Sequence, residues 1–135
     1  MGVLARLFGG ERESATDTGV SERTLNRYRH LLGTAPVESI EQAHTEAFAA
    51  LSESQRAEIY EELPREAGTG ERPLSSEPAT LARSATRVER RRPGTLEQTL
   101  RHADDRGDFD GSLLEPVVGH VTSSPLVSAF LPWNG

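Results

Sequence analysis

The sequence reads VESIEQAHTEAFAALSESQRAEIYEEL over residues 37–63, and this stretch decides the fold. Apolar side chains recur every three or four residues along its first half, which places them on one face of a helix. That pattern breaks at Ser52, which forms a capping-box pattern with Gln55 and predicts the start of a second helix, ending near Leu63 and Pro64. The positions on the predicted buried faces are Val37, Ile40, His44, Ala47, Phe48 and Leu51 in the first helix, and Ile59, Tyr60 and Leu63 in the second.

The segment before this stretch predicts one more helix. Leu25, Tyr28 and Leu32 follow a helical spacing from residue 21 onward, and Gly33 ends the pattern. Pro36 suits the first turn of the next helix, because its missing N–H would have no intrahelical partner there in any case. Residues 11–19 are polar and have no hydrophobic period, which is typical of a linker.

The segment after residue 63 predicts a loop and two further helices. Residues 64–75 contain two glycines and two prolines and therefore predict the loop. One helix is expected to start at residues 76–78 and to end before Pro93. A shorter helix is expected after it, because Thr95 and Gln98 form a second capping-box pattern. The predicted buried positions are Leu81, Ala85 and Val88 in the first of these helices, and Leu96 and Leu100 in the second.

These patterns predict an all-α protein, a small bundle of three to five short helices with flexible N-terminal and C-terminal segments. The expected organisation is a flexible segment over residues 1–20, a helical domain over 21–101, an acidic linker over 102–111 and an apolar tail over 112–135. No stretch shows the alternation of a β-strand, and the sequence contains no internal repeat.

The composition excludes several classes of function. All fifteen cationic residues of the 135-residue chain are arginines, and there is no cysteine. The chain therefore cannot use a lysine Schiff base, a P-loop lysine, a cysteine nucleophile, a disulfide or a zinc–thiolate site. A formal net charge of −6 argues against a general affinity for nucleic acid.

Residues 27–97 also resemble a known group of proteins. They contain RYRHLL, IEQAHTEAFAAL, SESQRAEIYEEL and ATLARSATRVERRRPGTLE, in an order and spacing similar to those of small, uncharacterised actinobacterial helical proteins. The resemblance covers about half of the chain, and it implies a helical fold without an established activity. Some of those proteins carry the label cation-transporting ATPase. That label fails here, because the chain has no P-loop lysine and no room for the membrane spans of a pump.

The sequence predicts no catalytic, cofactor-binding or metal-binding residues. The four histidines, His30, His44, His102 and His120, have no metal-ligand spacing, and His44 is interpreted as a partly buried side chain with a neighbouring partner. The twelve residues from Asp104 to Glu115 do not match a calcium loop, since the glycine required at the sixth position is replaced by Phe109.

A basic cluster comprises Arg87, Arg90, Arg91 and Arg92. Such a cluster could bind phosphate, RNA or an acidic lipid. The preferred interpretation is structural, because cations near the C-terminus of a helix are stabilised by its dipole. No aromatic residue nearby could stack on a base, which argues against nucleic acid as the partner.

The tail has three interpretations. It could pack on the helical domain and enlarge a thin core, it could dock on a partner protein, or it could lie in a membrane interface. Its interruption by three prolines argues against a membrane span. The predicted partner-binding residues in this tail are Leu126, Phe130 and Trp133.

The resulting prediction is a non-catalytic interaction or accessory protein of the cytoplasm, which binds an unknown protein partner and no cofactor or small-molecule substrate. The alternative is a peripheral membrane protein that uses the apolar tail. A third hypothesis is an enzyme whose carboxylates, such as Glu41 and Glu46, come together only in the fold.

Overall fold

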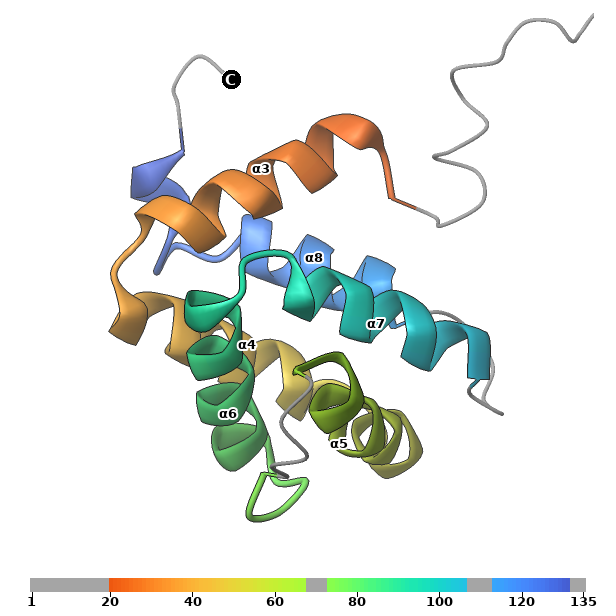
Figure 1. The fold of residues 1–135 in the computed structure, drawn as a ribbon. Coiled ribbons are helices and arrows are strands. Elements are labelled where there is room, and N and C mark those ends of the chain that lie inside the picture. Colours follow the sequence, from red (N-terminus) through yellow and green to blue (C-terminus); the bar gives the residue numbers. More distant parts are fainter. Residues whose placement is uncertain (1–19, 68–72, 107–112, 132–135) are drawn as a thin grey trace, which may run out of the picture.

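Six α-helices and a short 3₁₀ helix follow one another in the computed structural model, which describes residues 20–67, 73–106 and 113–131 (Figure 1). These ranges contain no β-strand, so the all-α prediction is confirmed. The expected three to five helices are too few, because a sixth helix forms in the segment predicted as a flexible tail. The elements are α3 (Glu22–Thr34), α4 (Val37–Ala49), α5 (Glu53–Ala67), α6 (Pro78–Arg91), α7 (Thr95–Arg106), α8 (Leu114–Thr122) and η1 (Ser128–Phe130).

Side-chain caps mark the starts of α3 and α5, whereas Pro36, predicted in the first turn of α4, directly precedes that helix and gives it no side-chain cap. The Ser21 hydroxyl accepts a hydrogen bond from the Thr24 N–H at 3.1 Å at the start of α3. At the start of α5, the Ser52 N–H donates to the Gln55 side chain at 2.9 Å and the Gln55 N–H donates to the Ser52 hydroxyl at 3.1 Å. This reciprocal pair is the predicted capping box.

The end of α5 differs from the prediction. The helix continues through Pro64 to Ala67, one turn beyond the expected end. Proline removes one hydrogen bond inside a helix, so the extra turn requires other contacts. One such contact is made by Glu66, whose carboxylate is hydrogen-bonded to His102 of α7.

The predicted linker over residues 102–111 is also partly helical, because α7 extends to Arg106. Asp104 lies in this last turn and accepts hydrogen bonds from the N–H groups of Leu113 and Leu114, the latter at 3.1 Å. An aspartate expected in a solvated linker therefore binds the N-terminus of the next helix, where a negative charge is stabilising. Residues 107–112 of the predicted linker, and residues 1–19 of the predicted flexible segment, lie outside the described residues.

Helix α8 completes the core. It packs on α3 and α4, while α4 also packs on α6, and α5 lies beside α7 (Figure 1). Most of the tail's apolar side chains thus belong to the same core as those of the other helices, which is the first of the three interpretations of this segment. Each such side chain contributes roughly 1.5–3 kcal/mol by leaving water. The buried residues of this segment are Leu113, Leu114, Val117, Val118, Val121 and Val127.

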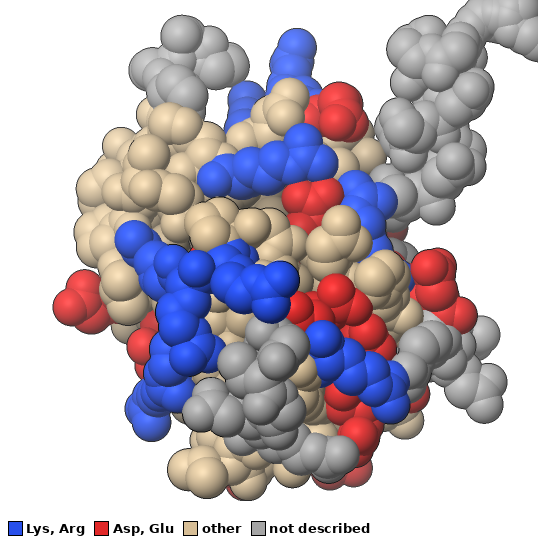
Figure 2. Space-filling model, in the orientation of Figure 1, with Lys and Arg blue, Asp and Glu red and all other residues tan. Residues whose placement is uncertain are grey.

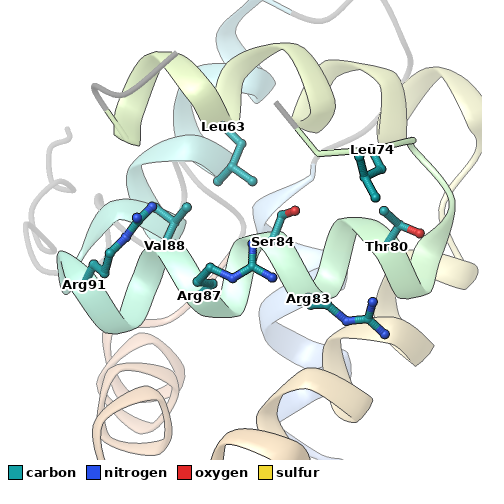
Figure 3. A pocket seen from close by; sticks show the side chains of 8 residues that line it. All are labelled: Leu63, Leu74, Thr80, Arg83, Ser84, Arg87, Val88 and Arg91. Carbon is teal, nitrogen blue, oxygen red and sulfur yellow. The ribbon is translucent and has the colours of Figure 1, made fainter. Parts of the chain in front are cut away.

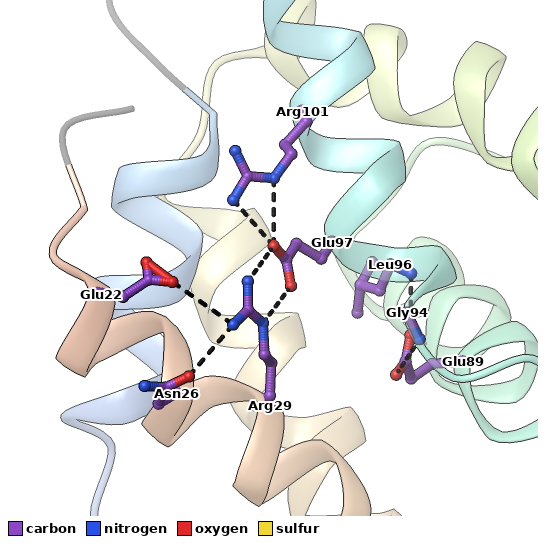
Figure 4. Close-up of polar contacts among 8 residues, drawn as sticks. All are labelled: Glu22, Asn26, Arg29, Glu89, Gly94, Leu96, Glu97 and Arg101. Atoms are coloured by element: carbon purple, nitrogen blue, oxygen red, sulfur yellow. Dashed lines mark hydrogen bonds and ion pairs between the residues drawn. The ribbon is translucent and has the colours of Figure 1, made fainter. Parts of the chain in front are cut away.

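Two glutamates connect the helices through polar contacts (Figure 4). The Glu89 carboxylate accepts hydrogen bonds from the N–H groups of Gly94 at 3.0 Å and Leu96 at 2.9 Å, so α6 caps the start of α7. Glu97 accepts two hydrogen bonds from Arg29 of α3, at 2.8 and 2.9 Å, and this bond lowers the pKa of the Glu97 carboxyl. Both contacts hold α7 in place against its neighbours.

Within the described ranges, no helix combines the length and the apolar character needed to cross a membrane.

Candidate functional site

Helix α6 presents a row of arginines to solvent. Arg83, Arg87 and Arg91 are four residues apart, so they lie one above another on one side of the helix. They line a cavity of about 330 Å³, which we call the arginine groove (Figure 3). The other residues that line it are Leu63, Leu74, Thr80, Ser84 and Val88.

The arginines of the groove differ in their contacts. The Arg83 Nε donates to Glu41 Oε2 at 3.3 Å, and both side chains are partly exposed. Among the described residues, none makes a hydrogen bond or ion pair with the Arg87 guanidinium. Figure 2 shows the cationic side chains gathered over α6, whereas acidic side chains gather over α5 and α7. The groove therefore presents positive charge on a protein of net negative charge.

The basic cluster predicted from the sequence is divided in the structure. Arg90 turns toward α3, where its Nη2 donates to the Ala35 carbonyl at 2.7 Å, and Arg92 lines a different cavity. Arg87 and Arg91 line the groove with Arg83, which the sequence analysis left out of the cluster. Their spacing of four residues in the sequence was the signal that could have identified the row.

A second candidate group of side chains lies between α5 and α7. Glu62 and Glu66 are one turn apart on α5, and both face His102 of α7. The His102 Nδ1 is hydrogen-bonded to Glu66 Oε2 and lies 3.7 Å from Glu62 Oε2. The hydrogen bond with Glu66 raises the pKa of His102. Burial raises the pKa of Glu66, but its hydrogen bonds, first that with His102, outweigh this effect and lower the pKa overall.

The other histidines have separate surroundings. The His44 ring is fully buried; its Nε2 is hydrogen-bonded to the Tyr28 hydroxyl and its Nδ1 to the Ile40 carbonyl, both at 2.8 Å. The predicted neighbouring partner is confirmed, whereas the ring is fully buried and not partly buried as predicted. Burial lowers the pKa of His44 to about 4, so the ring is neutral at pH 7.

The predicted partner-binding residues are only partly described. Leu126 and Phe130 are 36% and 40% exposed, and Trp133 lies outside the described residues. The two glutamates of the enzyme hypothesis contact different partners: Glu41 pairs with Arg83, and Glu46 lies 3.9 Å from His120. The sequence analysis therefore missed the pair of carboxylates that does come together, Glu62 and Glu66.

Comparison of this chain with protein-family models, with curated proteins and with solved structures finds no match. The resemblance of residues 27–97 to small actinobacterial helical proteins stays a prediction. The two candidate sites in the described residues are the arginine groove and the group formed by Glu62, Glu66 and His102.

Proposed function

We propose that the protein is a non-catalytic interaction protein that holds an acidic segment of a partner protein in the arginine groove. The observation that carries this proposal is the row of three arginines along a cavity of about 330 Å³. One of them, Arg87, has no polar partner among the described residues. A guanidinium group binds a carboxylate through two parallel hydrogen bonds, so each arginine suits one acidic side chain.

The spacing of the row favours an extended acidic segment. Residues four apart along an α-helix are separated by about 6 Å along its axis. Alternate side chains of an extended peptide lie about 6.5 Å apart and point to the same side. A segment with acidic residues at every second position would therefore place its carboxylates opposite Arg83, Arg87 and Arg91.

The groove also has an apolar part. Leu74 is 94% exposed and lines the cavity together with the buried side chains of Leu63 and Val88. Covering this leucine with a partner stabilises the complex by about 25 cal/mol for each Å² of apolar surface removed from water. The preferred segment therefore carries an apolar residue beside its acidic ones.

The chemistry of the groove supports binding instead of catalysis. Its described lining residues are arginine, serine, threonine and aliphatic side chains, and none of these residues has a carboxylate or imidazole that could act as a general base. None of the described lining residues has an aromatic ring on which a nucleic-acid base could stack. A membrane interface has less support, because most apolar residues of the described tail are buried in the core.

Fluorescence anisotropy with a labelled peptide tests the proposal. The peptide alternates glutamate with serine and contains one leucine, and a peptide with glutamine in place of glutamate serves as reference. We expect the acidic peptide to bind and the glutamine peptide not to bind. Arg87→Gln should weaken it about tenfold, the effect of one lost charged hydrogen-bonding group. Arg23→Gln, an equal charge change at an exposed position of α3, is the matched control.

Equal affinity of wild type and Arg87→Gln, or equal loss in both variants, would overturn the proposal. Two competitors extend the test: a single-stranded RNA oligonucleotide and vesicles that contain phosphatidylglycerol. Displacement of the peptide from the groove by RNA or by vesicles at lower concentration than by unlabelled peptide would show that a different class of partner is preferred, and would also count against the proposal.

A further inference from the structure

We propose that Glu62, Glu66 and His102 form a binding site for a divalent transition-metal ion at the contact between α5 and α7. The three side chains offer two carboxylate oxygens and one imidazole nitrogen that all lie within 4.8 Å of one another. This inference is independent of the arginine groove, and nothing in the proposed function requires it.

The set of donor atoms suits such an ion. Neutral imidazole nitrogen and carboxylate oxygen are both common ligands of Zn²⁺ and related ions, whereas Ca²⁺ and Mg²⁺ prefer sites made of oxygen alone. The imidazole comes from α7 and the carboxylates come from α5, so the ion would be held between two helices. The spacing of Glu62 and Glu66, four residues apart, places both carboxylates on the same face of α5.

The distances require little rearrangement. Ligand atoms at about 2.1 Å from a tetrahedral ion are roughly 3.4 Å from one another. The distance from His102 Nδ1 to Glu62 Oε2 is 3.7 Å, close to this separation. His102 Nδ1 and Glu66 Oε2 are in hydrogen-bond contact, so they need to separate only enough for the ion to replace the shared proton.

The two oxygens of Glu62 have different roles. Oε1 accepts a hydrogen bond from the Arg65 Nη1 at 3.2 Å, while Oε2 faces His102. A hydrogen bond to the second oxygen of a ligand carboxylate is the usual way in which proteins orient a metal ligand. The Glu62 side chain is 5% exposed, so its orientation is fixed by its surroundings.

The charge of the group formed by Glu62, Glu66 and His102 also favours a divalent cation. Glu62 and Glu66 bring two carboxyl groups together beside one imidazole, and burial of Glu62 makes uncompensated negative charge costly there. A divalent cation would neutralise both. Glu66 also lines a cavity of about 280 Å³ with Arg92, Pro93 and Gly94.

Two measurements on the full chain test the site. Isothermal titration calorimetry with ZnCl₂ should give one ion per chain, and His102→Gln should weaken the affinity by about tenfold or more, as the loss of a ligand does. His102 is half-exposed, so this change leaves the core intact. The matched control is His120→Gln, which alters an exposed histidine paired with the single carboxylate of Glu46. Its affinity for Zn²⁺ should equal that of wild type.

The second measurement needs no variant. Addition of substoichiometric Mn²⁺ should broaden the imidazole NMR signals of His102 before those of His30, His44 and His120. The proposal is overturned if wild type shows no heat with Zn²⁺ at millimolar concentration, or if His102→Gln binds as tightly as wild type. It is also overturned if Mn²⁺ broadens another histidine first.

Discussion

His44 is a fully buried titratable side chain, and both of its ring nitrogens are hydrogen-bonded. Tyr28 and Phe48 flank the ring, with centroid distances of 5.7 and 5.8 Å. A protonated imidazolium would need charge compensation in this apolar surrounding, and burial therefore lowers its pKa to about 4. The histidine thus makes the stability of the fold depend on pH.

The first prediction follows from this pKa. The unfolded chain protonates His44 below pH 6.5, whereas the folded chain does so only below about pH 4. The contribution of His44 to stability is therefore complete above pH 6.5 and is lost as the pH falls toward 4. At about 1.4 kcal/mol for each pH unit, the loss is roughly 3 kcal/mol.

Urea denaturation of wild type and of His44→Gln at pH 7 and pH 4.5 measures this effect. Other groups titrate in the same window and contribute to both proteins. We expect the difference in unfolding free energy between the two proteins to shrink toward pH 4.5. A difference independent of pH would show that His44 is not held in its neutral form.

At the scale of the helix, the sequence predicts the start of α5 because the two partners of its capping box, Ser52 and Gln55, are close neighbours in the chain. The same reasoning fails at α7. The predicted partner of Thr95 was Gln98, but the Thr95 hydroxyl donates to the Arg92 carbonyl at 2.6 Å, and the N-terminus is capped by Glu89 of the preceding helix. A cap supplied from another helix has no local pattern.

Helix α8 is the element that the sequence pattern obscures most. Pro116 suggests an interruption, yet it lies in the first turn of the helix, where a proline has no intrahelical hydrogen bond to lose. Its first N–H groups bind Asp104 from α7, which again is a contact that only the fold brings about. Because the residues that cap α8 lie outside it, the local sequence pattern does not indicate a helix there.

The second prediction concerns this helix. Leu114→Ala should lower the free energy of unfolding by about 2–5 kcal/mol, because Leu114 is fully buried and its truncation leaves a cavity. Leu126→Ala, in the same apolar segment but exposed, should cost well under about 1 kcal/mol. Thermal and urea denaturation followed by circular dichroism measure both. Equal, small effects would mean that α8 does not belong to the core.

At the scale of the whole molecule, the fold places cationic and acidic side chains on different parts of the surface. Arg83, Arg87 and Arg91 of α6 line one groove, and acidic side chains gather over α5 and α7 (Figure 2). The sequence identifies a basic cluster near the end of this helix, but it does not show which arginines share a face with a cavity. That depends on the fold, which brings Leu63 of α5 and the exposed Leu74 to the side of α6 that carries these arginines.

The group of Glu62, Glu66 and His102 shows the same limit. A search for histidines at short spacing finds no metal site, because the ligands come from helices that are separated by a third helix in the sequence. Only the packing of α5 against α7 brings them together. The fold class is therefore predictable from local patterns, whereas both candidate sites depend on contacts between distant segments.

The central claim is that an acidic segment binds along α6, and NMR of the arginine side chains tests it most directly. On titration of labelled protein with the alternating acidic peptide, we expect the Nε–Hε signals of Arg83, Arg87 and Arg91 to shift together and to saturate at one peptide per chain. Shifts confined to Leu126, Phe130 and Trp133, the contact residues predicted from the sequence, would contradict the claim and assign docking to the C-terminal segment.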